Sequence, residues 1–279
     1  MTQAATVPAG PGQPRPLGAI EAIRLGWRLM MSDFWRLWLV AFVQMLILMA
    51  ANSVLSIIAV VVVLPPLAAG MFYVVSRRID GQPADLSGLF NGFQQRFGQS
   101  VLGFLPVAGA SIVLGVIVGI IVAVAFLVPA GLVETTGRDE GPGVGVLLVV
   151  LGAAAAILLI GLLALAFNIF TLFFTFLFPA VWDHPESGWA AVRASMRLVR
   201  GHFWPVLGLV LIFWLLAGVA NFAGLLACCI GILFTGPVMV VWETASIMYL
   251  YRSCTGRPLV QPIAGGPVPP APAGPSALV

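Results

Sequence analysis

The chain has 279 residues, of which 61% are hydrophobic and 8% charged, and its formal net charge is +3. Soluble domains carry a charge on about a quarter of their residues, so this composition excludes an ordinary soluble domain. The long apolar runs also exclude an outer-membrane barrel, whose strands alternate apolar and polar residues, and they predict an all-α integral membrane protein.

The two ends of the chain differ in composition from the apolar middle. Residues 1–18 are small, polar and proline-rich, lack the apolar core of a signal peptide, and are predicted to form a disordered tail. Residues 259–279 are rich in proline, alanine and glycine and predict a second disordered tail, either a solvated spacer or a docking segment for a partner. The membrane domain is therefore expected within residues 19–258.

The hydrophobic blocks between the tails are compared with the roughly 20 residues that a helix needs to cross a bilayer. The run Phe34–Ile79 is long enough for two spans, and Asn52 and Ser53 are the expected turn between them. The run Phe203–Tyr251 predicts two more spans, with a break near Cys229–Gly231. The predicted spans are 34–53, 56–79, 101–130, 144–181, 203–228 and 232–251.

Arginine placement predicts the orientation of these spans. All 13 basic residues are arginine, and Arg138 alone lies in the acidic segment between the third and fourth hydrophobic blocks. By the positive-inside rule the other twelve face the cytoplasm, loop 132–143 faces outward, and the block Val144–Trp182 crosses once. We expect a multi-pass protein of the bacterial inner membrane with both termini cytoplasmic. Because the arginines flank hydrophobic runs, they do not indicate nucleic-acid binding.

A shift of 169 residues superposes two parts of the chain. The segment AIRLGWRLMMSDFWRLW, from Ala22, then lies on AVRASMRLVRGHFWPVL, from Ala191. This match predicts a parallel internal repeat of the first and last hairpins, each preceded by a short amphipathic helix and an aromatic turn. The segment DLSGLFNGFQQRFGQS suggests a third, divergent copy, with Asp85 or Ser87 as the helix N-cap.

The short helices carry arginine at helical spacing. In the first helix the expected apolar face consists of Ile20, Ile23, Trp27, Met30 and Met31. Such a helix can lie in the headgroup layer with its arginines among phosphates, or it can pack on the cytoplasmic ends of the bundle. The predicted contacts to anionic lipid headgroups are Arg24, Arg28, Arg193, Arg197 and Arg200.

The stretch AAVRASMRLVRGHFWPVLGL carries a recognisable pattern of alanine and serine before a basic residue, then Gly-x-Phe-Trp entering a span. Over roughly Ala19–Pro258 the chain resembles a bacterial family of six-span membrane domains. That family includes the membrane portion of some glycerophosphodiester phosphodiesterases and related stand-alone proteins. The resemblance implies a fold but no activity, because the metal-binding His and Glu constellation of the phosphodiesterase domain cannot be assembled from this chain.

Enzymatic and metal chemistry find little support in the sequence. Two histidines and three cysteines without CxxC spacing predict no metal and no cofactor. The segment Asp183-His184-Pro185-Glu186 is interpreted as a polar break after a span, because no nucleophile or metal accompanies it. We therefore expect a non-enzymatic protein with no catalytic residue.

Glu243 is the acidic residue embedded in a predicted span. It precedes Tyr251 by eight residues, or about 12 Å along a helix. Three interpretations stay open: a neutral acid bonded to a neighbouring helix, a cation or proton site, or a lipid-facing position. The candidate intramembrane polar site consists of Glu243, Thr244, Asn168, Thr171 and Thr175.

Two functions are compatible with these patterns. The first is a membrane scaffold that organises lipids or a partner protein, with a homo-oligomer as one form of partnership. The second is a transporter or permease-like protein with a polar path through the bundle. Several polar residues around one cavity would indicate the transporter, whereas a well-packed interior would indicate the scaffold.

Overall fold

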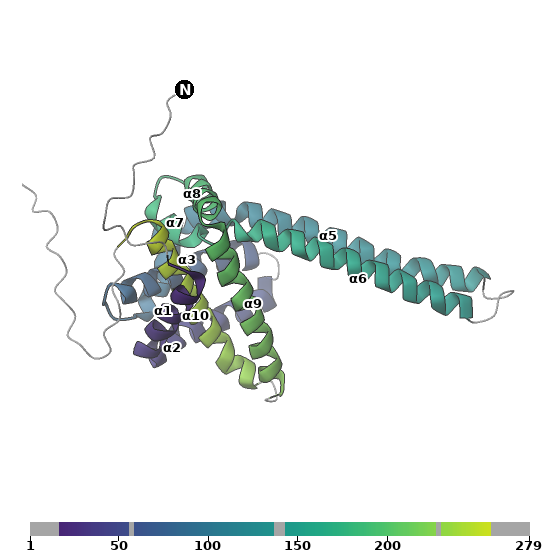
Figure 1. The fold of residues 1–279 in the computed structure, drawn as a ribbon, viewed down its shortest axis with the longest axis horizontal. Coiled ribbons are helices and arrows are strands. Elements are labelled where there is room, and N and C mark those ends of the chain that lie inside the picture. Colours follow the sequence, from purple (N-terminus) through teal and green to yellow (C-terminus); the bar gives the residue numbers. More distant parts are fainter. Residues whose placement is uncertain (1–16, 56–58, 137–142, 227–229, 258–279) are drawn as a thin grey trace, which may run out of the picture. The chain divides into compact units, whose positions relative to one another are not determined.

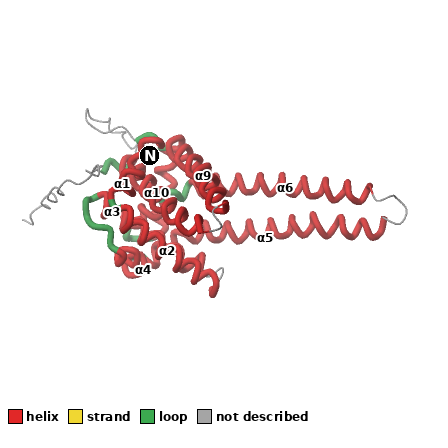
Figure 2. Tube along the Cα trace, turned by 90° about the horizontal axis from the view of Figure 1, so that it is seen from below, coloured by secondary structure: helices red, strands yellow, loops and turns green. Residues whose placement is uncertain are grey.

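The computed structural model describes residues 17–55, 59–136, 143–226 and 230–257 (Figures 1 and 2). Within these ranges the chain forms helices and no strand. Six helices in this described part of the chain are long and apolar enough to cross a membrane, so the protein is a multi-pass membrane protein. The chain divides into unit 1, Met1–Gly103 with Thr175–Val279, and unit 2, Phe104–Phe174.

Short and long helices follow one another along the described part of the chain. They are α1 (Ala19–Ser32), α2 (Phe34–Leu55), the π-helix η1 (Ala59–Val63), α3 (Leu64–Ile79), the 3-10 helix η2 (Leu86–Phe90), α4 (Asn91–Gln95), α5 (Phe97–Thr136), α6 (Gly143–Leu172), α7 (Leu177–Asp183), α8 (Gly188–Gly201), α9 (Phe203–Leu226) and α10 (Ile230–Cys254). The candidate spans are Phe34–Val54, Val60–Ile79, Phe97–Ala125, Val149–Asp183, Phe203–Phe222 and Leu233–Cys254.

The predicted turn at Asn52 and Ser53 is wrong. Both residues lie inside α2, which continues to Leu55. The Ser53 hydroxyl donates a hydrogen bond to the Ala50 carbonyl at 2.8 Å, which lets a polar side chain remain in an apolar helix. Residues 56–58 and 227–229 lie outside the described residues. Of the break expected near Cys229–Gly231, Ile230 and Gly231 lie inside α10.

The fourth span is interrupted where one long helix was predicted. Helix α6 ends at Leu172, and α7 begins at Leu177. The amides of Phe173 and Phe174 donate to carbonyls three residues earlier, at 3.2 and 2.9 Å, which tightens the chain into turns. Pro179, in the first turn of α7, has no amide hydrogen with which to continue the helical ladder.

In the core of unit 1, α3 packs on both α7 and α10. The rings of Phe72 in α3 and Phe178 in α7 have centroids 6.1 Å apart. Phe176, directly before α7, lies 5.7 Å from the ring of Tyr251 in α10. Phe176 and Tyr251 are buried, so these large side chains hold the three helices together largely by removing apolar surface from solvent.

A short helical element covers each of these three core helices. Helix α1 packs on α10, η2 and α4 pack on α3, and α8 packs on α7. Glycine permits the closest approaches, because a Cβ atom at Gly26 would overlap the Ser246 hydroxyl and one at Gly92 would overlap the Pro66 carbonyl. Close backbone approach therefore positions the short helices against the core.

The start of α2 lies beside the start of α10. The ring centroids of Phe34 and Phe234 are 6.2 Å apart, and the Trp38 indole N–H donates to the Phe234 carbonyl at 3.2 Å. The predicted orientation instead places the start of α2 and the start of α10 at opposite membrane faces. The two starts meet because α1 packs along α10: the chain begins near Ser253, passes Trp242 along α1, and only then enters α2.

Helices α1 and α8 share length, ending and burial pattern. Each has 14 residues and is followed by one non-helical residue, Asp33 (φ −148°, ψ 51°) or His202 (φ −133°, ψ 41°). Arg96, directly before α5, has a similar backbone (φ −133°, ψ 21°). The buried residues of the two helices are Ala22, Ile23, Gly26, Leu29 and Met30 in α1 and Gly188, Ala191, Val192, Ser195 and Val199 in α8.

The apolar face predicted for α1 is correct only in part. Ile23 and Met30 are buried, whereas Ile20, Trp27 and Met31 are exposed. Alanine and glycine occupy much of the contact with α10, because small residues bring the two helices close together. Ile20, Trp27 and Met31 therefore share the exposed face with the arginines.

Asp85, one of the two N-cap candidates expected from the sequence, is the N-cap of η2. Its carboxylate accepts hydrogen bonds from the Ser87 hydroxyl at 2.5 Å and from the Ser87 amide at 3.3 Å. The hydroxyl bond, and then the amide bond, hold the pKa of Asp85 below its ordinary value because they favour the charged form.

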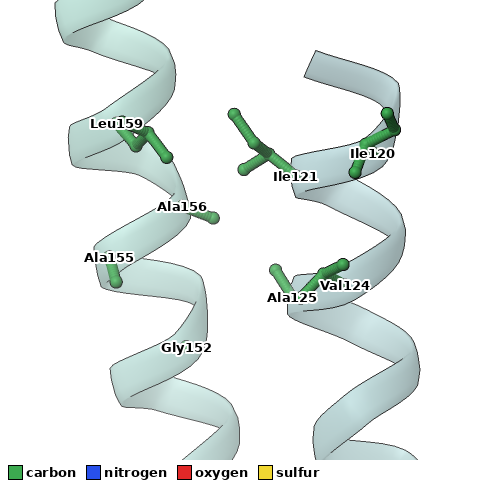
Figure 3. Close-up of a pocket in the computed structure, with 8 residues that line it drawn as sticks. All are labelled: Ile120, Ile121, Val124, Ala125, Gly152, Ala155, Ala156 and Leu159. Carbon is green, nitrogen blue, oxygen red and sulfur yellow. The ribbon is translucent and has the colours of Figure 1, made fainter. Parts of the chain in front are cut away.

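Within unit 2, α5 and α6 lie side by side as a hairpin (Figures 1 and 2). A groove of about 410 Å³ runs between them and is lined by Ile120, Ile121, Val124, Ala125, Gly152, Ala155, Ala156 and Leu159 (Figure 3). This lining has no side chain that could bind a charged or polar group. The groove therefore suits packing in hydrocarbon rather than chemistry.

Candidate functional site

Nine described arginines of unit 1 form two groups, and the first group is paired with carboxylates. Three aspartates at helix ends, Asp33, Asp80 and Asp183, bind arginines from other parts of the chain. The arginines in these ion pairs are Arg36, Arg78, Arg252 and Arg257.

Arg252 is the most buried arginine among these ion pairs. The two terminal nitrogens of Arg252 donate to the two carboxylate oxygens of Asp80 at 2.6 and 2.9 Å. Arg252 also donates to the hydroxyl and carbonyl oxygens of Ser76, at 2.8 and 3.1 Å. Its side chain is 6% exposed and that of Asp80 48% exposed, so this bidentate contact anchors the end of α10 to the end of α3.

Asp183 joins the end of α7 to α10 and the segment after it. The Tyr251 hydroxyl donates to one carboxylate oxygen at 2.5 Å, and Arg257 donates to the other at 2.6 Å. The carboxylate therefore has a strong partner on each oxygen.

Asp33 joins the turn after α1 to the end of α3. One carboxylate oxygen lies 3.7 Å from Arg78, which also donates to the Ser32 hydroxyl at 3.2 Å. Arg36 lies 3.9 Å from the same carboxylate, but its exposed side chain makes this a weak pair.

The three aspartate partners were not predicted from the sequence, which treats the arginines as orientation signals. A signal was available, because Asp33 and Asp80 are helix C-caps and Asp183 is the last residue of α7. The negative end of the helix dipole disfavours a carboxylate at that position. An aspartate at a helix C-terminus, in a chain poor in charge, therefore indicates a cationic partner.

The second group of arginines is exposed and unpaired. None of its members forms a hydrogen bond or ion pair with any residue in the described part of the chain. The members are Arg24 and Arg28 on α1 and Arg193, Arg197 and Arg200 on α8, the five headgroup contacts expected from the sequence.

Two of these arginines line a groove between α1 and α10. The α1–α10 groove has a volume of about 410 Å³ and is lined by Ile23, Arg24, Trp27, Arg28 and Trp242. The indole N–H of Trp242 donates to the Ile23 carbonyl at 2.9 Å, and its ring meets that of Trp27 edge-on at 4.8 Å. The groove thus combines aromatic walls with two free guanidinium groups.

Exposure along α10 changes at the level of this groove. Leu233 and Phe234, near the start of the helix, are exposed apolar side chains. From Thr244 to Ser253 every side chain is buried. Trp242 therefore lies just before the buried part of α10, with the exposed Glu243 between them.

Glu243 follows Trp242 and is exposed on the surface of α10. It forms no hydrogen bond or ion pair with the described residues, whereas Thr244 beside it is buried. Asn168 donates to the Ala164 carbonyl at 2.7 Å, and Thr171 donates to the Asn168 carbonyl at 3.0 Å. The bonds of these two side chains stay within α6, in unit 2.

Thr175 and Glu243 both belong to unit 1. Thr175 lies in the turn between α6 and α7, whereas Glu243 lies on α10. The carboxylate of Glu243 is therefore not hydrogen-bonded to any other member of the predicted polar site, within the described residues.

The structure also places the histidine and cysteine residues considered in the sequence. The His184 ring lies 3.9 Å from the exposed Glu186 carboxylate, and Cys254 is a free, half-buried thiol. Cys228 and Cys229 lie outside the described residues. Among the residues that the structure describes, no three His, Cys, Asp or Glu side chains are grouped so as to hold a metal ion.

Comparisons with protein-family models, with curated proteins and with solved structures give no match for this chain. Its geometry is therefore the basis for a functional proposal.

Proposed function

We propose that the protein is a non-enzymatic membrane scaffold that binds anionic phospholipids through the unpaired arginines of α1 and α8. The observation that carries this proposal is the division of the arginines into two groups. Four arginines have aspartate partners, whereas five exposed arginines on two short helices have no partner among the described residues. Lipid phosphates would supply the missing anions, because guanidinium groups bind phosphate in a bidentate manner.

The surroundings of these arginines support lipid rather than a soluble anion. Ile20, Trp27 and Met31 are exposed on α1 between and beside the arginines. On and after α8, Trp189 and Trp204 are exposed, the latter at 78%. Arginine mixed with tryptophan and aliphatic side chains is typical of helices that contact both headgroups and acyl chains.

The orientation forms part of this proposal. We place α8, the beginning of α1 and both termini at the cytoplasmic face of a bacterial inner membrane, following the positive-inside rule, with α1 running along α10 away from that face. Because α1 packs along α10, its arginines would extend their long side chains toward the phosphates while their methylene groups cover apolar surface.

We also propose that the chain contains three copies of one structural repeat: α1–α3, η2–α7 and α8–α10. The equal lengths of α1 and α8 and the similar backbone at Asp33, Arg96 and His202 support this arrangement. The short helical element of each repeat packs on the last helix of another repeat: α1 on α10, η2 and α4 on α3, and α8 on α7. Three such contacts link the repeats in a closed ring. The proposed relationship to the six-span membrane domains of glycerophosphodiester phosphodiesterases concerns this fold only.

Replacing all five unpaired arginines with glutamine tests the proposed function. Each basic residue near an anionic surface contributes about 1 kcal/mol, so the variant is expected to lose most of its preference for anionic lipid. The ratio of phosphatidylglycerol to phosphatidylethanolamine in lipid extracted from the purified protein measures this preference. An Arg36→Gln/Arg77→Gln variant is the control, because Arg36 lies near Asp33 and Arg77 bonds Gln82. An unchanged ratio in the fivefold variant would contradict the proposal.

A further inference from the structure

We infer that the α1–α10 groove binds one anionic phospholipid, with its phosphate between Arg24 and Arg28 and an acyl chain against Trp27 and Trp242. This inference rests on the proposed lipid binding and assigns one defined site to it. The remaining unpaired arginines, on α8, would then contact the anionic surface without holding an individual molecule.

The two arginines are placed to bind a single phosphate. Arg24 and Arg28 are four residues apart on α1, which puts their side chains on one face about 6 Å apart at Cβ. Both are exposed and lack a partner among the described residues. Two like charges at this spacing repel each other, so an anion between them relieves the repulsion and gains charge-assisted hydrogen bonds.

The apolar wall of the groove is held in position before a ligand binds. The Trp242 ring is fixed by its hydrogen bond to the Ile23 carbonyl, at 2.9 Å, and by the Phe213 ring, at 5.3 Å. Trp27 closes on Trp242 from α1, at 4.8 Å. A preformed wall binds more tightly than a mobile one, because little conformational entropy is lost on binding.

The lining of the groove favours a phospholipid over a free phosphate ion. Arg24 and Arg28 line it together with Ile23, Trp27 and Trp242, so guanidinium groups and apolar walls belong to one groove. Its volume of about 410 Å³ falls within the usual range of small-molecule sites, roughly 300–1,000 Å³. A phospholipid is an occupant whose charged and apolar parts match both halves of this surface.

Helix α8 provides a matched control within the same chain. Arg193 and Arg197 repeat the four-residue spacing of Arg24 and Arg28. At the position equivalent to Trp27, however, α8 carries Met196. A variant of the α8 pair therefore removes the same charge at the same spacing without altering the aromatic groove.

Native mass spectrometry of the full-length protein with added phosphatidylglycerol can count bound lipids and measure their affinity. We expect Arg24→Gln/Arg28→Gln to weaken binding of the first lipid about tenfold or more, from about 1 kcal/mol per arginine. Arg36→Gln/Arg77→Gln, which removes two charges outside the proposed lipid-binding set, should leave that first affinity nearly unchanged. Arg193→Gln/Arg197→Gln should weaken the binding of later lipids more than that of the first. Trp27→Ala, which changes no charge, should also weaken the first lipid, and phosphatidylcholine should bind less tightly than phosphatidylglycerol.

Three outcomes would overturn the defined site. Equal weakening by the α1 and α8 pairs would show diffuse electrostatic binding, which leaves the proposed function standing. Displacement of the first lipid by millimolar inorganic phosphate would show that the groove takes a free anion. If no variant weakens binding of the first lipid, the groove is not its site. The proposed function is tested separately: it fails if the fivefold variant retains the wild-type ratio of phosphatidylglycerol to phosphatidylethanolamine.

Discussion

Asp80→Ala is expected to destabilise the protein more than Arg252→Met, although the two side chains form one ion pair. Without Asp80, the 6%-exposed guanidinium of Arg252 keeps only Ser76 as a partner among the described residues. Without Arg252, the 48%-exposed Asp80 carboxylate can turn to water. We expect a loss of about 3 kcal/mol for Asp80→Ala and about 1–2 kcal/mol for Arg252→Met, because an unpaired buried charge is the costlier result.

Thermal unfolding of the protein in one detergent, followed by circular dichroism, measures this difference. Asp85→Ala is the matched control, because it removes another exposed carboxylate whose bonds are local to Ser87. Equal midpoints for the Asp80 and Arg252 variants would show that burial of the guanidinium does not control stability at this contact.

Gly70→Ala should have a similarly large effect through packing. A Cβ atom at Gly70, in α3, would overlap the carbonyl of Leu89 in η2. The backbone cannot yield as a flexible side chain can, so we expect a loss of about 1–3 kcal/mol or more. Gly98→Ala is the control, because a Cβ there meets no described atom within 4 Å and should be neutral or stabilising by up to about 1 kcal/mol.

The same unfolding experiment compares the two glycine variants. A decrease for Gly70→Ala with no decrease for Gly98→Ala would support the close contact of η2 with α3. If the Gly70 variant unfolds at the wild-type temperature, that contact is looser than the structure shows.

The helical class and six apolar helices could be predicted because they depend on the length and composition of contiguous segments. The N-cap at Asp85 could also be predicted, because a cap depends on residues only two or three positions away. The turn expected at Asn52 and Ser53 failed for a local reason as well, since a serine hydroxyl can bond a carbonyl of its own helix.

Contacts between distant segments could not be predicted in the same way. Asp80 and Arg252 are 172 residues apart, and no local pattern pairs them. The Trp182 indole N–H likewise donates to the Ala69 carbonyl at 2.9 Å, 113 residues away along the chain. The same holds for the candidate site. The spacing of Arg24 and Arg28 can be read directly from the sequence, but the position of Trp242 beside them depends on how α1 packs on α10.

The two arginine groups imply two separable effects on the protein. Paired arginines stabilise the helical core in any environment, because their partners belong to the chain. Unpaired arginines contribute when an anionic lipid is present. The protein would then hold its fold through Asp33, Asp80 and Asp183 and its lipid through α1 and α8.

The most direct test is the thermal midpoint of each variant, measured in detergent alone and again with added phosphatidylglycerol. A ligand at about one hundred times its dissociation constant stabilises a protein by about 2.7 kcal/mol, so lipid binding should raise the wild-type midpoint. We predict that Asp80→Ala lowers the lipid-free midpoint but keeps the increase on lipid addition. The fivefold glutamine variant should keep the lipid-free midpoint and lose the increase. If instead the fivefold variant shows the wild-type increase, the unpaired arginines do not bind anionic lipid.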